Sequence, residues 1–236
     1  MANEVRTLGT VPPRPGTGTD VDLSPAQHDG RDWLERHQTL ILSVVGALVL
    51  VGIGVFLYRE FIVKPQQAEA SEYMWQAQQL FAQDSFEVAL LGRPDGSVLG
   101  FETIAEDYGG TPAGNLAEYY AGISYLHLGQ YDAAIDALES FDEDGSLLPA
   151  TKAGALGDAY AQKDDLASAR GHYDTALSEA GDNSLLAPYY LKKLALLDER
   201  EGNVAQANER YRRIKSEFPT SNEASDIDKF VLRTDS

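Results

Sequence analysis

A helical pattern with small residues at fixed places recurs through the C-terminal part of the chain. Gly122, Gly157 and Ala195 occupy equivalent places in it, 35 and 38 residues apart. Such a recurrence is typical of a helix–turn–helix unit that cannot bury its apolar face alone and therefore stacks on its neighbours. The same region is rich in Ala, Leu, Glu and Gln, and no strand alternation competes with the helical pattern. The spacing predicts an all-α solenoid.

The residue types within the unit indicate how it folds. In the clearest copy, Gly122 and Ala134 are small where two helices must approach closely. Gly129 follows the first helix, where glycine permits a tight turn. Asp164 and Gly202 take the place of Gly129 in the next two copies. We therefore expect paired helices in close contact, joined by turns at these residues.

The period is close to the roughly 34 residues of a tetratricopeptide repeat. The sequence predicts three clear repeats, an interrupted first unit with a turn-rich insertion near residues 85–98, and a C-terminal capping helix. The alternative is an irregular α-helical domain whose small residues match by chance. The predicted boundaries are about 66–110, 115–148, 150–183 and 188–219 for the repeats and 221–232 for the cap, within a domain that covers 66–236.

An apolar segment precedes the repeats. Thr39–Tyr58 is a run of 20 residues without a charge, and a helix of that length, at ~1.5 Å per residue, matches the hydrocarbon core of a bilayer. We expect one transmembrane helix with span 39–58 inside an anchor at 31–64. A buried core helix is the alternative. Residues 1–30 are rich in Pro, Gly and Thr and are expected to form a disordered tail.

The flanks of the apolar segment leave its orientation open. It follows 38 mostly polar residues, which favours an uncleaved anchor over a signal peptide. Arg31 and Arg36 precede the segment, and Arg59 and Lys64 follow it. Because the positive-inside rule compares these two flanks, the basic residues do not decide which end is cytoplasmic.

The chain is acidic, with a formal net charge of -18. Residues 66–236 contain 30 acidic and 13 basic side chains. Such a surface repels phosphate backbones, so nucleic acid is not expected as a partner. One hypothesis is that the acidity reflects a high-salt habitat, in which screening reduces the repulsion among carboxylates. An ordinary acidic domain is the alternative.

Motifs for catalysis and metal binding are missing from the sequence. The chain has no cysteine. It also lacks a nucleophile elbow, a zinc-protease helix motif and a phosphate-binding loop. Its four histidines do not have the spacing of metal ligands. We therefore expect no enzymatic activity, no cofactor and no metal site.

A longer stretch carries a more specific resemblance. Gly114–Gly129 reads GNLAEYYAGISYLHLG, and over residues 32–232 the chain resembles bacterial membrane-anchored tetratricopeptide proteins of the ancillary SecYEG translocon subunit type, in their Bacteroidetes-like version. The resemblance implies a single-pass protein of the inner membrane with a cytoplasmic N-terminus and a periplasmic repeat domain. It also implies a role as an accessory to the translocon or to periplasmic chaperones.

Tetratricopeptide domains bind partner segments on the concave surface that the first helix of each repeat lines. Transferring the family's groove offsets onto this chain selects eight partner-groove candidates whose aromatic, aliphatic and polar groups suit a peptide. The alternative is that these are solvated helix faces. The candidates are Tyr119, Ile123 and His127 in the first clear repeat, Asp158 and Gln162 in the second, and Tyr189, Lys192 and Leu196 in the third.

Two functions follow from these features. The first is a membrane-anchored protein–protein interaction scaffold of the bacterial envelope, which docks translocon, chaperone or client segments. The alternative is a structural scaffold that self-associates through its repeats or its anchor. Such a scaffold would organise an envelope assembly, for example in division or outer-membrane biogenesis.

Overall fold

The computed structural model describes residues 24–142 and 147–235, with side chains from residue 37 onward. The chain divides into two compact units, Met1–Phe56 and Leu57–Ser236. Each unit is described by itself below, as the N-terminal and the C-terminal unit.

The N-terminal unit contains most of α1 (Ser24–Tyr58), which includes the predicted span. The apolar side chains of this helix are exposed; Leu50, for example, is 71% exposed. Among the described residues, one helical stretch is long and apolar enough to cross a membrane, and α1 supplies its apolar part. α1 begins within the range predicted as a tail, whose residues 1–23 lie outside the described residues.

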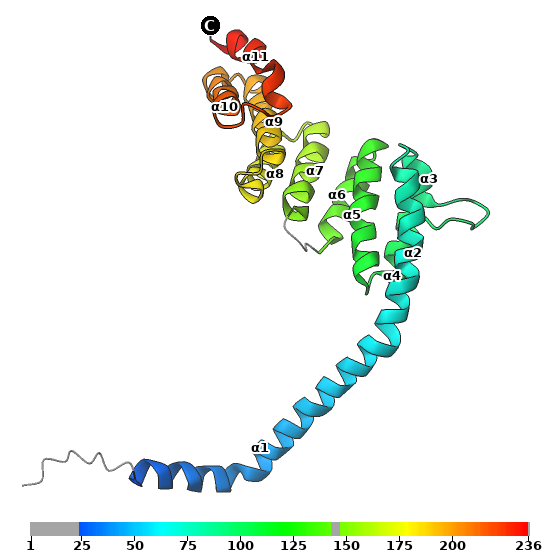
Figure 1. Ribbon diagram of the computed structural model, residues 1–236, viewed down its shortest axis with the longest axis vertical. Helices are drawn as coiled ribbons and strands as arrows, with labels where there is room; N and C mark the ends of the chain where they lie inside the picture. The colour runs from blue at the N-terminus through cyan, green and yellow to red at the C-terminus, as the bar shows by residue number, and fades with distance from the viewer. Residues whose placement is uncertain (1–23, 143–146, 236) are drawn as a thin grey trace, which may run out of the picture. The chain divides into compact units, whose positions relative to one another are not determined.

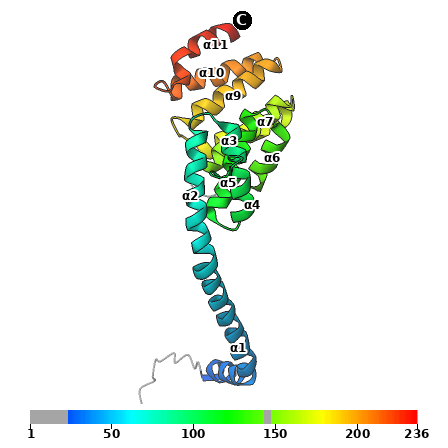
Figure 2. The same cartoon turned by 90° about the vertical axis from the view of Figure 1, so that its right-hand side faces the viewer.

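The C-terminal unit consists of helices that follow one another in chain order (Figures 1 and 2). Each helix packs mainly on its neighbours in the sequence. The predicted fold class, an apolar N-terminal helix followed by a solenoid of helix pairs, is confirmed. A π-helical turn at Arg59–Val63 leads into α2 (Lys64–Phe81), α3 (Phe86–Leu91), α4 (Phe101–Tyr108), α5 (Pro112–His127), α6 (Tyr131–Ser140), α7 (Leu148–Gln162), α8 (Leu166–Ala180), α9 (Leu186–Arg200), α10 (Val204–Glu217), a 3-10 turn η2 (Glu223–Asp226) and α11 (Ile227–Thr234).

Small residues set the distance between paired helices, as the sequence predicts. A Cβ atom on Gly122 of α5 would lie 2.6 Å from Cγ of Leu138 in α6. A Cβ atom on Gly157 of α7 would lie 2.6 Å from Cδ1 of Tyr173 in α8. Carbon atoms in a packed interior do not approach so closely. The two pairs therefore reach this separation because glycine occupies both positions.

The turns between paired helices confirm the second local prediction. The backbone φ angle is +75° at Gly129, +65° at Asp164 and +80° at Gly202. Asp84, after α2, has the same left-handed backbone with φ of +57°. This conformation is costly for most residues with a Cβ atom, and aspartate tolerates it better than most. The interrupted first unit thus turns in the same way as the three clear repeats.

Aromatic side chains hold the first unit against the second. The ring of Phe81, at the end of α2, has its centroid 5.2 Å from that of Phe86, 6.1 Å from that of Phe101 and 5.2 Å from that of Tyr120 in α5. Edge-to-face contacts of this kind are favourable for aromatic rings. In addition, Oε1 of Gln67 accepts a hydrogen bond from the backbone N–H of Ala113, in the first turn of α5.

The insertion near residues 85–98 contains one helical element that its turn-rich sequence does not reveal. This is α3, whose Ala89 and Leu90 are buried in the core of the first unit. Gly92 and Leu99 then form an isolated antiparallel bridge. The insertion therefore closes on itself and returns the chain to the start of α4.

Ion pairs join consecutive units in the C-terminal half of the solenoid. Their partners lie 28 to 36 residues apart, which is about one repeat. Among the described residues, no ion pair joins α2–α4 to α5–α6. The pairs between units are Lys163 with Asp132, Lys193 with Asp158 (2.8 Å), Arg200 with Asp164 (2.5 Å), Arg170 with Asp198 (2.9 Å) and Glu201 (2.7 Å), Lys192 with Asp226 (3.2 Å) and Arg233 with Glu199 (2.6 Å).

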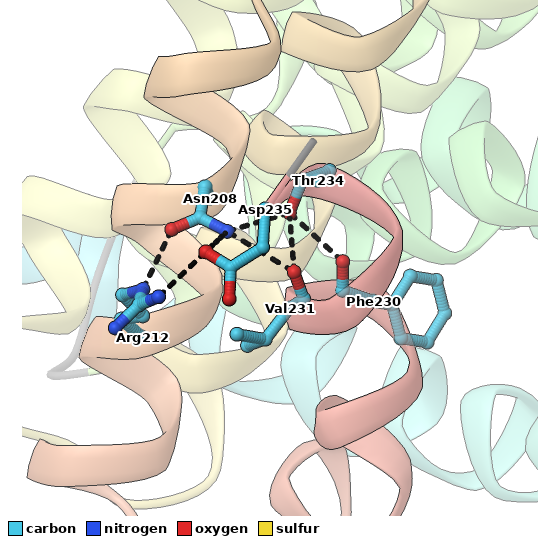
Figure 3. A network of polar contacts seen from close by, with 6 residues as sticks. All are labelled: Asn208, Arg212, Phe230, Val231, Thr234 and Asp235. Carbon is cyan, nitrogen blue, oxygen red and sulfur yellow. Dashed lines mark hydrogen bonds and ion pairs between the residues drawn. The ribbon is translucent and has the colours of Figure 1, made fainter.

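The C-terminal helix α11 covers the end of the solenoid. Ile227 is 1% exposed in the core between α9, α10 and α11. Figure 3 shows how Asn208 of α10 holds the end of α11: its Nδ2 donates to the Val231 carbonyl (3.1 Å) and to Thr234 Oγ1 (2.9 Å). Arg212, one turn further along α10, donates to Oδ1 of Asp235 at 2.6 Å. The predicted capping helix thus packs on the last repeat, with Ile227 buried and Phe230 and Val231 partly buried against it.

Candidate functional site: a groove across three repeats

Helices α5, α7 and α9, the first helices of three consecutive units, line one cleft of about 400 Å³. Tyrosines from α6 and α8 complete it. A cleft across successive first helices is a surface on which a segment of another protein can bind. We call it the groove, and its lining residues are Leu126, His127, Tyr131, Asp158, Ala161, Gln162, Tyr173, Lys193 and Arg200.

A carboxylate at the centre of the groove joins three helices. Asp158 of α7 accepts a 2.5 Å hydrogen bond from the hydroxyl of Tyr173 in α8. The same oxygen, Oδ1, accepts a 2.8 Å hydrogen bond from Nζ of Lys193 in α9. Lys193 also lies 5.3 Å from the ring centroid of Tyr189 and 6.0 Å from that of Tyr173. The groove therefore already holds an ammonium group between a carboxylate and two aromatic rings.

The protonation states of these groups agree with that arrangement. Burial raises the pKa of Tyr173, and the adjacent Asp158 carboxylate raises it further, so the hydroxyl remains a donor. Burial by itself lowers the pKa of Lys193, but the charge and hydrogen bond of Asp158 outweigh it and hold that pKa above its usual value. The lysine is therefore an ammonium ion at neutral pH.

Three of the eight predicted residues line the groove. They are His127, Asp158 and Gln162, and each lies in the last turns of a first helix. The ring of His127 stacks on Phe86 of α3, with centroids 4.0 Å apart and planes 3° from parallel. The short helix of the insertion thus supports one end of the groove.

Two further predicted residues are exposed on α9 beside Lys193. Tyr189 is 38% exposed and Leu196 is 42% exposed. They lie four residues before and three residues after Lys193, so all three side chains share one face of the helix. This face continues the groove with an aromatic and an aliphatic side chain.

The structure does not bring the remaining three predicted residues into the groove. Tyr119 and Ile123 are half-buried against the core between α5, α6 and α7, and the Tyr119 ring contacts Phe141 with centroids 5.5 Å apart. Lys192 forms an ion pair with Asp226 and lies 5.0 Å from the ring centroid of Phe230 in α11. These side chains stabilise contacts between neighbouring helices, and their role in partner binding stays a prediction.

Six groove residues are absent from the predicted set, and two of them, Leu126 and Ala161, directly precede the predicted His127 and Gln162. Arg200 lies five residues after Ala195, the same offset at which His127 follows Gly122 and Gln162 follows Gly157, so the repeat spacing could have identified it. Lys193, Tyr131 and Tyr173 give no comparable signal, because Tyr131 and Tyr173 belong to second helices and Lys193 aligns with Tyr120 and Ala155. These three enter the groove through helix packing.

A second cleft, of about 520 Å³, lies between α4, α5 and α6. Its charged lining residues are Glu102, Glu106, Glu118 and Asp136. Burial raises the pKa of Glu118. In residues 37–142 and 147–235, no group of three or more His, Asp and Glu side chains is arranged to hold a metal ion.

Comparison with protein families matches residues 116–144 and 192–221 to the tetratricopeptide repeat. The first match covers most of α5 and all of α6, and the second covers the latter part of α9 with α10. No curated protein sequence matches the chain. The chain is thus of the tetratricopeptide-repeat type, and repeats of this type indicate a protein–protein interaction scaffold, a fold that is generally non-catalytic.

Proposed function

We propose that this protein is a membrane-anchored scaffold of the bacterial envelope that binds segments of partner proteins in the groove. The observation that carries this proposal is the groove itself, to which three consecutive units contribute aromatic, aliphatic, amide and charged side chains. Residues of this kind recognise a peptide by shape and hydrogen bonding. Binding of this type needs no catalytic group.

The exposed apolar surface of α1 supports the membrane part of the proposal. Its side chains from Leu40 to Tyr58 lie in water in the isolated chain, and a bilayer is the environment that removes such a long apolar helix from water. The resemblance to the ancillary translocon subunit type supports an inner-membrane location, a cytoplasmic N-terminus and a periplasmic repeat domain. It also supports the translocon, periplasmic chaperones or client chains as partners.

Photo-crosslinking in native membranes tests the binding surface. A photoreactive amino acid replaces Leu196, which is exposed beside the groove, and in a control protein it replaces Leu232, which is exposed on α11. Adducts with translocon or chaperone subunits at Leu196, without the same adducts at Leu232, support the proposal. Identical adducts at both positions, or none at either, contradict it. Adducts of Leu196 only with a second copy of this chain favour the self-associating scaffold.

The absence of cysteine from the chain permits a direct test of orientation. A single cysteine at Thr220, an exposed position after α10, is the only thiol of the variant. Labelling by a membrane-impermeant maleimide in cells with a permeabilised outer membrane supports a periplasmic repeat domain. Labelling only after the inner membrane is broken contradicts that orientation.

A further inference from the structure

The net charge of the repeat domain lies almost entirely in its first half. Residues 66–148 contain 15 acidic side chains and one basic side chain, Arg93. Residues 149–236 contain 15 acidic and 12 basic side chains. A segment that approaches the groove therefore meets a strongly negative field from the units at its α5 end, and this field attracts cations and repels anions over a Debye length of ~8 Å or more.

The basic residues of the groove do not offset this field for an incoming anion. Lys193 is engaged by Asp158 at 2.8 Å, and Arg200 is engaged by Asp164 at 2.5 Å. Both cations are thus neutralised by carboxylates of the preceding unit. An anionic segment would have to displace one of these carboxylates before it gained a cationic contact.

The groove does offer acceptors to an incoming cation. Both hydrogen bonds to Asp158 end on Oδ1, and no described residue donates to its Oδ2. The ring of Tyr189, which is exposed, lies 5.3 Å from the Lys193 ammonium group. Carboxylate oxygens and tyrosine rings are the groups that bind lysine and arginine side chains of a partner.

Apolar surface lies next to these acceptors. Leu126 lines the groove, and Leu196 is exposed on the same face of α9 as Lys193. A segment that carried only charges would leave these side chains in water. The best complement is a segment in which basic residues are interspersed with apolar ones.

We propose that the groove selects a cationic segment of a partner protein, one that combines lysine or arginine with apolar residues. This inference rests on the proposed function, because it names the chemistry of the segment that the groove binds. The negative half of the domain accelerates the encounter, and the groove supplies the specific contacts. The binding weakens as salt screens the attraction.

Three fluorescent model peptides test the charge preference. They share length and apolar residues and differ only in their charged positions, which are all lysine or arginine, all glutamate, or all glutamine. Fluorescence anisotropy with the full-length protein in detergent micelles measures the affinity of each at low and at high salt. The expected order is basic, then neutral, then acidic, and the affinity of the basic peptide falls with salt.

Two substitutions with equal change in charge test whether the basic peptide binds in the groove. Gln162→Lys adds a positive charge inside the groove, and Gln206→Lys adds one on the exposed face of α10, outside it. Repulsion of like charges should lower the affinity for the basic peptide by about fivefold or more in Gln162→Lys. In Gln206→Lys the affinity should change by less than about twofold.

The outcomes separate this inference from the proposed function. The charge preference is overturned if the acidic or the neutral peptide binds more tightly than the basic one. If that binding is also lost in Gln162→Lys or in a Leu196→Asp variant, the groove remains the binding site. Equal binding of the basic peptide by both lysine variants overturns the inference, because attachment is then a general effect of the acidic surface. The proposed function fails separately, when Leu196 crosslinks to no partner in membranes.

Discussion

Asp198 of α9 and Arg210 of α10 form a 2.9 Å hydrogen-bonded ion pair, although the aspartate is completely buried. Arg170 of α8 approaches the second carboxylate oxygen of Asp198, also to 2.9 Å. In the two preceding repeats, the equivalent position holds Tyr125 and Tyr160. One buried carboxylate thus joins three helices from two units where the other repeats use a ring.

Replacement of Asp198 by alanine should destabilise the repeat domain by about 3 kcal/mol, because it leaves two partly buried guanidinium groups without their shared carboxylate. Urea unfolding followed by circular dichroism measures the change in the free energy of unfolding. Asp174→Ala, at an exposed position of α8, is the control and should change this free energy by less than ~0.5 kcal/mol. Equal effects of the two substitutions would show that the ion pairs at Asp198 add no stability.

Two glycine-to-alanine substitutions should change the free energy of unfolding in opposite directions. Gly157→Ala brings a Cβ atom to 2.6 Å from Cδ1 of Tyr173, and the resulting overpacking should cost about 1–3 kcal/mol. Gly171 on the exposed face of α8 has no atom within 4 Å of such a Cβ, so Gly171→Ala should stabilise by ~0.5–1 kcal/mol through helix propensity. Thermal and urea unfolding of both variants measures whether each substitution stabilises or destabilises the repeat domain. Stabilisation by Gly157→Ala would mean that α7 and α8 are further apart than the 2.6 Å contact implies.

Asp84 tests the left-handed turn of the first unit. Its φ angle is +57°, so Asp84→Ala should destabilise by about 1 kcal/mol, because alanine adopts this backbone poorly and lacks the short polar side chain. Asp84→Gly should be neutral or stabilising by urea unfolding, since glycine adopts the conformation without strain. A more stable alanine variant than glycine variant would refute the assignment of this turn.

His172 should make stability depend on pH in weakly acidic solution. Burial lowers its pKa below the ordinary 6.5, with opposition from the charge of Glu139, while its ring stacks on Tyr160 with centroids 5.2 Å apart. The unfolded chain therefore takes up the proton more readily than the folded one, and stability falls as the pH drops below about 6.5. The loss levels off below the folded-state pKa.

Urea unfolding at pH 7.5 and 5.5, chosen as about one unit on either side of the ordinary histidine pKa, measures this effect. In His172→Phe, which keeps the stacked ring, the loss of stability between the two values should be smaller. The carboxylates titrate in both proteins, so the difference isolates the histidine. An identical loss in both proteins would exclude a contribution from His172.

Added salt should protect the first half of the repeat domain more than the second. Screening reduces repulsion among the 15 acidic side chains of residues 66–148, whereas in residues 149–236 it also weakens attractive ion pairs between units. Hydrogen exchange measured by mass spectrometry at low and at molar salt should show the larger gain of protection in α2–α6. A uniform gain would indicate that the charge asymmetry does not affect stability.

The fold could be predicted from the sequence because its signals are local. A turn at Gly129 or Asp164 depends on the backbone of one residue, and a close helix pair at Gly157 depends on one missing side chain. The short helix α3 escaped prediction because its six residues lie next to a turn-rich stretch, and its burial depends on the core of the first unit.

The groove could be predicted only in part, because helix rotation and packing decide which side chains face it. Successive residues point about 100° apart on a helix, so neighbouring Lys192 and Lys193 face different surfaces. Lys192 is attracted by Asp226 and the ring of Phe230, which occur only beyond the last repeat. An offset taken from an average repeat does not include the contacts of a unit that borders the cap.

The ion pairs between units also determine the order in which the units can be arranged. Lys193 finds its carboxylate one unit earlier at Asp158, and Arg170 finds its carboxylates one unit later at Asp198 and Glu201. A chain in which the second and third clear repeats were exchanged would keep both left-handed turns and both apolar cores, yet it would separate these charges from their partners. The three C-terminal repeats are therefore not interchangeable modules, and the recombination that lengthens or shortens repeat arrays is restricted to the junction before α5, where no charge pairing has to be preserved among the described residues.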